Sequence, residues 1–135
     1  MGAPFPILVP QADADGNELG GIRLPQVEVP QATYTPWNFR SESNGAPHEL
    51  ANFRGAYLPI AVTEAERRRS GDPRPSIEDR YASRDEYLGR YARAAMELAQ
   101  DGFLLPQDLS GMLSQAGDFW YYAMQSHEAA EAVGQ

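Results

Sequence analysis

The spacing of hydrophobic residues changes near residue 62. Before it, short apolar runs alternate with turn-forming residues, and eight prolines fall within residues 4–60. After it, apolar residues recur every three or four positions, which is typical of one buried face of a helix. The pattern therefore predicts a β-prone and extended region over residues 1–62 and a helical region over residues 63–135. The expected fold class is α+β, mainly helical.

The first region opens with the signature of a β-hairpin. Two apolar runs, residues 5–10 and 21–24, flank the turn-forming residues 13–18 (DADGNE). Asp-Gly readily adopts the positive φ that such turns need. The same six residues also resemble the start of a calcium-binding loop. However, Glu18 and Leu24 stand where that loop needs Gly and Glu. The hairpin turn is the favoured interpretation, and calcium binding is the alternative.

Residues 25–43 (PQVEVPQATYTPWNFRSES) are too rich in proline for a helix and too aromatic for an ordinary linker. Residues 26–29, bracketed by Pro25 and Pro30, alternate like an edge strand whose ends are blocked from pairing. Residues 33–40 are expected to be extended or turning, because Thr35 precedes a proline and is biased away from helix. This region is predicted to form an irregular, proline-rich strap.

The aromatic end of the strap holds the candidate binding residues Tyr34, Trp37, Asn38 and Arg40. One interpretation is that the rings, together with Phe39, pin an irregular segment onto a hydrophobic core. The other is that Trp37, Asn38 and Arg40 line a cleft. In that case the Arg40 guanidinium would be available to a carboxylate or phosphate.

Two helix starts are marked in the second region. Thr63 with Glu66, and Ser83 with Glu86, have the spacing of capping boxes. An apolar stripe of about four turns follows the second box. The bulky residues at 119–124 cannot all face one core, so some are expected to face a partner. The Ala- and Glu-rich tail after His127 is predicted to fray.

The composition limits the kinds of partner and site that are expected for this chain. The formal net charge is −8, with acids and bases interspersed, which disfavours nucleic acid. The chain has no cysteine, so neither disulfides nor thiolate metal sites are expected. No apolar run approaches the roughly 20 residues of a membrane span. The first residues lack the basic start and helical apolar core of a signal peptide, so none is expected here, and the compartment stays open.

The sequence contains no catalytic motif of its own. It has no Gly-x-Ser-x-Gly nucleophile elbow, no His-Glu-x-x-His and no phosphate-binding glycine loop. The two histidines, His48 and His127, lack metal-ligand spacing and are interpreted as surface residues. We therefore predict no catalytic residue, no metal site and no cofactor within these 135 residues.

An ordered series of short segments nevertheless resembles the C-terminal portion of a bacterial group, the α/β-hydrolase domain-containing proteins. These segments are residues 10–18 (PQADADGNE), 21–25 (GIRLP), 32–40 (ATYTPWNFR), 55–59 (GAYLP), 63–67 (TEAER), 71–81 (GDPRPSIEDRY) and 103–108 (FLLPQD). The sequence departs from the family pattern at Pro36, where Gly is expected, and in the unmatched aromatic residues 119–124.

The resemblance implies that the nucleophile, the acid and the catalytic His lie in an upstream catalytic domain, the expected partner. The chain is then a gene fragment or a separately encoded subunit that serves ester or similar acyl hydrolysis as a structural and docking segment. Full-length relatives are often exported. Leu, Ile, Val and Phe make up about 19% of the chain, below the roughly 20% that marks a chain short of core. The alternative is a non-catalytic protein-interaction module.

Overall fold

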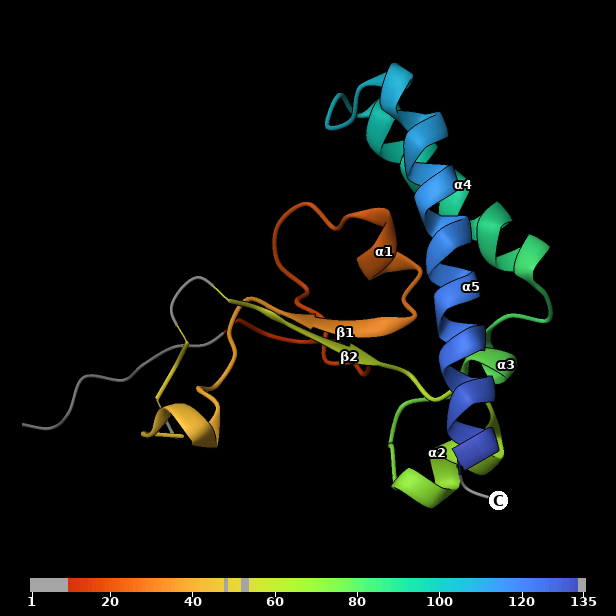
Figure 1. Cartoon of the computed structure of the whole chain (residues 1–135). Helices are drawn as coiled ribbons and strands as arrows, with labels where there is room; N and C mark the ends of the chain where they lie inside the picture. The colour runs from red at the N-terminus through yellow and green to blue at the C-terminus, as the bar shows by residue number, and fades with distance from the viewer. Residues whose placement is uncertain (1–9, 48, 52–53, 134–135) are drawn as a thin grey trace, which may run out of the picture.

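The computed structural model describes residues 10–47, 49–51 and 54–133, with side chains as far as His127. Two long helices lie side by side, and a short sheet projects from them (Figure 1). The predicted class, α+β and mainly helical, is confirmed. The elements in chain order are α1 (Pro25–Glu28), β1 (Ala32–Thr35), η1 (Glu42–Asn44), β2 (Ala56–Pro59), α2 (Glu64–Ser70), α3 (Ile77–Arg80), α4 (Arg84–Gln100), η2 (Pro106–Asp108) and α5 (Leu109–Val133).

The sheet pairs β1 with β2 in antiparallel register, with Tyr34 opposite Tyr57. The outer edge of β1 is covered by the buried side chain of Asn17. Its Oδ1 accepts from the Tyr34 N–H at 2.8 Å, and its Nδ2 donates to the Ala32 carbonyl at 3.1 Å. Because an unpaired strand edge exposes backbone donors and acceptors, this amide stabilises β1 in place of a third strand.

The predicted N-terminal hairpin is confirmed at its turn only. Ala12 and Glu18 form an antiparallel bridge, and Gly16 between them has φ +77°, as an Asp-Gly turn requires. Residues 21–24 form no strand, and residues 5–9 lie outside the described residues. The two-stranded sheet forms instead between segments that are separated by the 20 residues of 36–55.

The prediction of an edge strand at residues 26–29 is wrong, because Pro25–Glu28 form the helical turn α1. Pro25 occupies the first turn, where its missing N–H is not needed and its fixed φ suits a helix. Arg23 holds the turn through its Nε contact with Glu28 at 2.8 Å and its Nη2 contact with the Val27 carbonyl at 3.1 Å. These contacts outweigh the β preference of the two valines.

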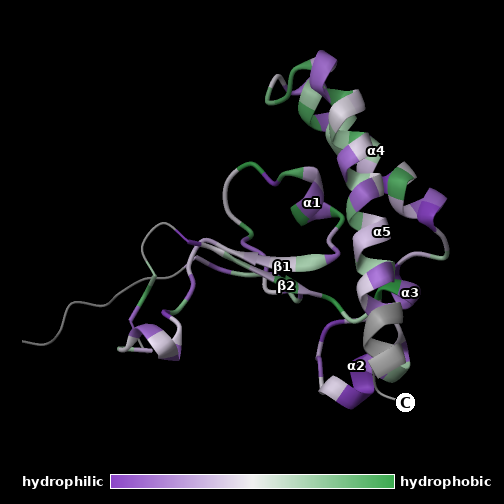
Figure 2. Ribbon diagram, in the orientation of Figure 1, coloured by the Kyte–Doolittle hydropathy of each residue, from purple (hydrophilic) through white to green (hydrophobic). Residues whose placement is uncertain are grey.

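Helices α2 to α5 form a unit that we call the helical body. Both predicted capping boxes are present: the N–H of Glu66 donates to Thr63, and the N–H of Glu86 donates to Ser83. Each glutamate also accepts from the backbone N–H just before its cap residue. Helix α2 buries none of its residues, and Figure 2 shows it as predominantly hydrophilic.

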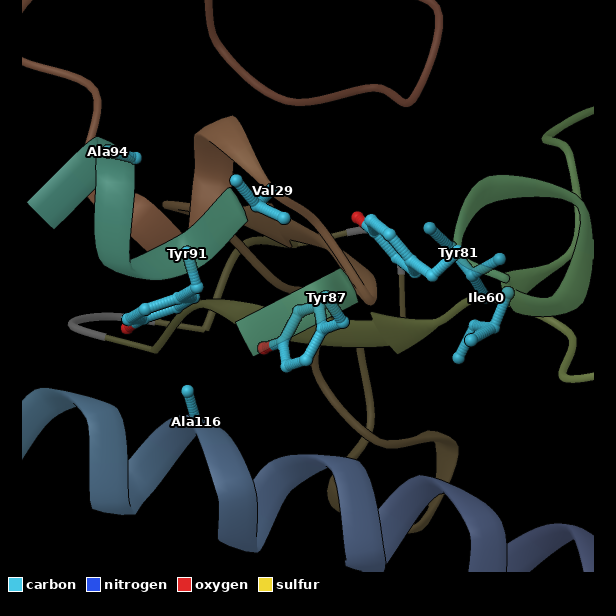
Figure 3. Packing of buried hydrophobic residues seen from close by; sticks show 8 residues of the cluster. Val29, Ile60, Tyr81, Tyr87, Tyr91, Ala94 and Ala116 are labelled. Carbon is cyan, nitrogen blue, oxygen red and sulfur yellow. The ribbon is translucent and has the colours of Figure 1, made fainter. Parts of the chain in front are cut away.

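The core lies where α4 runs antiparallel to α5 (Figure 1), and Val29 and Ile60 from the first half of the chain belong to it. Tyr87 and Tyr91 reach from α4 toward α5, where Ala116 lies (Figure 3). Trp120 of α5 closes the cluster, with its ring centroid 5.2 Å from that of Tyr87 and 6.4 Å from that of Tyr81. Helix α5 continues to Val133, and the fraying of its tail stays a prediction.

Arg74 joins the sheet to the helical body. Its Nη groups donate to the carbonyls of Leu58 and Pro59, each at 2.9 Å. They also donate to Thr33 Oγ1 at 2.9 Å and to Asp72 Oδ2 at 2.6 Å. One guanidinium thereby fixes both strands against the connector that leads into α3.

Residues 36–55 connect β1 to β2 and form what we call the arm. The arm extends away from the helical body and carries η1 (Figure 1). A bridge between Phe39 and Leu50 draws its two sides together. The N–H of Arg40 donates to the Glu49 carbonyl at 2.9 Å, which strengthens the same closure. None of the described helices is long and apolar enough to cross a membrane.

Candidate docking site

Tyr34 lies apart from the other three candidate binding residues. Its ring contacts that of Tyr57 across the sheet, edge to face, at a centroid distance of 5.5 Å. Burial raises the pKa of the Tyr34 hydroxyl to about 12, with smaller contributions from Tyr57 and Tyr91. Tyr34 is therefore a neutral, half-buried part of the sheet face and does not belong to the arm.

Trp37 lies at the start of the arm and is 49% exposed, and Phe39 is 53% exposed. The two rings contact each other edge to face at 5.5 Å. The interpretation that these rings pin the segment onto a core of this chain is wrong. They form a small aromatic cluster on the surface instead.

Asn38 and Arg40 line a hollow of about 660 Å³ within the arm. The two sides of the arm meet across it, since the Ala51 N–H donates to the Asn38 carbonyl at 2.8 Å. Arg40 Nη1 lies 3.2 Å from Glu49 Oε2. The hollow is lined by Asn38, Phe39, Arg40, Ser41, Asn44, Glu49, Leu50, Ala51 and Arg54. The structure thus brings Asn38 and Arg40 together, with Trp37 packed on Phe39 beside them.

Sequence reasoning missed Arg54, the second guanidinium in this hollow. It stands 14 positions after Arg40, in a loop without a regular pattern, so no spacing signal connects the two. The neighbouring Gly55 marks a close approach, because a Cβ there would overlap the carbonyl oxygen of Thr35. Such an approach becomes visible only when the strands are paired.

A second hollow, of about 290 Å³, lies between the end of β2, α2 and the C-terminal half of α5. His127 lines it, and its Nδ1 lies 3.2 Å from Glu66 Oε2. The His127 side chain is only 13% exposed, so its interpretation as a surface residue is wrong. The other histidine, His48, lies outside the described residues.

The turn that resembles a calcium loop holds arginine side chains. Asp13 Oδ2 accepts from Arg23 at 2.7 Å, and Asp15 Oδ2 accepts from Arg80 at 2.8 Å. Burial alone would raise the pKa of Asp13, but hydrogen bonds from Arg23, Asn17 and Asp15 hold it below its ordinary value. Both carboxylates are thus neutralised by guanidinium groups, which supports the interpretation as a turn. In the described part of the chain, no three His, Asp or Glu side chains are grouped to hold a metal ion.

Comparison with known proteins agrees with the resemblance seen in the sequence. No curated protein and no solved structure matches the chain. The family described as Alpha/beta hydrolase domain matches residues 4–114. This match covers the arm, the sheet, α4 and the start of α5, and it ends before Trp120. Because the match spans most of its length, the chain belongs to the Alpha/beta hydrolase domain family.

Proposed function

We propose that this chain is a structural and docking segment of an α/β hydrolase, with its catalytic residues in an upstream domain. Hydrolysis of an ester or similar acyl substrate then requires both parts. Family membership supports the hydrolase context. The lack of a Gly-x-Ser-x-Gly elbow in these 135 residues supports a catalytic residue set elsewhere.

The proposal rests on the exposed apolar side chains of the arm. Trp37, Phe39 and Leu50 are 49%, 53% and 57% exposed, and they lie on a segment that projects from the helical body (Figure 1). Aromatic side chains bury about 150–250 Å² each when covered, so two of them contribute strongly to an interface. Grouped exposed apolar residues on a soluble chain are typical of a surface that another protein covers. The arm therefore suits docking onto a catalytic domain.

The test begins with the genomic segment upstream of this coding sequence. We expect it to encode a domain with a Gly-x-Ser-x-Gly elbow. Coexpression with this chain, tagged, should give a complex that hydrolyses p-nitrophenyl esters, while the tagged chain alone does not. Trp37→Ala should weaken capture of that domain, and Arg68→Ala, on the exposed last turn of α2, should not.

Two results would contradict the proposal. One is ester turnover by the chain alone that disappears when one of its own serines is replaced. The other is an upstream domain that is fully active and never associates with this chain. The second result would favour a non-catalytic interaction module.

A further inference from the structure

The hollow of the arm carries an imbalance of charge. It is lined by two guanidinium groups, those of Arg40 and Arg54, and by one carboxylate, that of Glu49. The Arg40–Glu49 pair is exposed, with side chains 46% and 68% accessible, and such surface pairs are weak. Among the described residues no carboxylate pairs with Arg54. One positive charge of the hollow therefore has no counter-charge among the residues that the structure describes.

The hollow lies in a segment that is less acidic than the rest of the chain. Residues 36–55 carry two arginines and two glutamates, so the arm is formally neutral in a chain of net charge −8. An acidic group on a partner would be repelled by most of this molecule but not by its arm. At physiological salt the Debye length is about 8 Å, so the charges beside the hollow matter more than the distant ones.

Neutral donors complete the lining. Asn38 Oδ1 accepts from the Phe39 N–H at 2.8 Å, which leaves the Asn38 side-chain N–H groups as donors. Ser41 and Asn44 add a hydroxyl and a second amide. Two guanidinium groups and two amides can satisfy the several lone pairs of a carboxylate, which guanidinium binds in a planar, two-bond geometry. The Trp37–Phe39 cluster beside the hollow would exclude water and strengthen those bonds.

We propose that the hollow of the arm is a carboxylate-binding site in which Arg54 and Arg40 receive an acidic side chain of the catalytic domain. The source of the carboxylate rests on the proposed function, whereas the site itself does not. Arg54 is the principal cation, because Arg40 already contacts Glu49. Docking would then combine the aromatic contact at Trp37 with a charge contact in the adjacent hollow.

The site can be tested on the free chain with sodium acetate as the probe, at an ionic strength held constant with sodium chloride. Nuclear magnetic resonance would follow the arginine Nε–H signals, and the indole N–H signal of Trp37 would serve as a second readout. We expect a saturable shift of the Arg54 and Arg40 signals at millimolar acetate. Arg54→Gln should weaken acetate binding about tenfold, as loss of a charge-assisted hydrogen bond predicts.

Matched variants sharpen the test. Arg54→Lys keeps the charge but loses the planar fork, so it should bind acetate between wild type and Arg54→Gln. Arg69→Gln, which removes another exposed arginine, from α2, should leave acetate binding unchanged. The proposal is overturned if acetate shifts follow a straight line without saturation, or if Arg54→Gln binds like wild type. Inorganic phosphate binding more than tenfold tighter than acetate would overturn the carboxylate assignment.

The docking role and the carboxylate site can be refuted independently of each other. If acetate binds as expected but no catalytic domain is captured, the docking role is wrong and the carboxylate site stands. If the domain is captured equally by wild type and Arg54→Gln, and acetate does not bind, the site is wrong and docking through the aromatic cluster stands.

Discussion

The two tryptophans lie in opposite surroundings. Trp120 is packed against Tyr81 and Tyr87 and closes the core of the helical body. Trp37, on the arm, contacts Phe39 and is 49% exposed. The helical body buries the rings of Tyr81, Tyr87 and Tyr91 and is stabilised by them, although Tyr121 and Tyr122 of α5 are 54% and 60% exposed. The arm directs its rings outward, where they contribute to the free energy only when a partner covers them.

The largest expected effect is that of Trp120→Ala. Trp120 is partly buried against Tyr87, so removing its ring uncovers part of the core and should cost roughly 2–3 kcal/mol, in the lower part of the range for large-to-small core changes. Urea unfolding should show the loss as a lower midpoint with an unchanged slope. A loss below about 1 kcal/mol would mean that α5 does not hold the core, and the contrast with the arm would disappear.

Gly55→Ala tests the junction between the sheet and the arm. An added Cβ would overlap the backbone carbonyl oxygen of Thr35, which cannot move without disturbing β1. Overpacking of this kind costs about 1–3 kcal/mol. Gly89→Ala is the matched control, because a Cβ there meets nothing within 4 Å. In the interior of α4 it should raise stability by up to about 1 kcal/mol. If the free energy of unfolding changes equally and in the same direction in both variants, the close approach at Gly55 does not limit stability.

Acid should weaken the contact between the helical body and the sheet. Hydrogen bonds from Arg74 hold the pKa of Asp72 below its ordinary value of 3.8, although burial opposes them. A depressed pKa means that the stabilisation is complete above the unfolded value and is lost as the pH falls through the folded value. Asp72→Asn should cost about 1 kcal/mol at pH 7 and should flatten the stability curve below pH 4. If Asp72→Asn loses stability below pH 4 as steeply as the wild type does, the Asp72–Arg74 pair does not link the helical body to the sheet.

Local signals predicted the helical body well. Thr63 and Ser83 cap α2 and α4, because a capping box depends on residues three positions apart. The same kind of reasoning failed at residues 26–29, where the contacts of Arg23 with Glu28 and the Val27 carbonyl favour a helical turn. The sequence showed β preference there but not these side-chain contacts.

The candidate site was predicted only in part, because its geometry depends on non-local pairing. The sequence singled out Asn38 and Arg40, and the structure places both in one hollow. It did not indicate Arg54, which reaches that hollow only because β1 pairs with β2. The burial of the His127 side chain was not predicted for the same reason, since its contact with Glu66 joins residues 61 positions apart. The spacing of hydrophobic residues does not indicate contacts between residues so far apart in the sequence.

The smallest expected effect on stability is that of Trp37→Ala in the free chain. Truncating a side chain that is half exposed and contacts the ring of Phe39 should cost under about 0.5 kcal/mol, as surface substitutions do. The same change should be severe in the complete hydrolase, where covering the ring is worth about 3–5 kcal/mol. Urea midpoints of the free chain and capture by the upstream domain therefore need to be measured on the same variant, with Arg68→Ala as the surface control. Arg40→Ala should likewise reduce capture more than Arg68→Ala does, since Arg40 lies in the hollow beside the rings. If Trp37→Ala destabilises the free chain as strongly as Trp120→Ala, the arm is part of this chain's own core. If Trp37→Ala and Arg40→Ala both behave like Arg68→Ala in the capture experiment, the arm is only a linker between two strands.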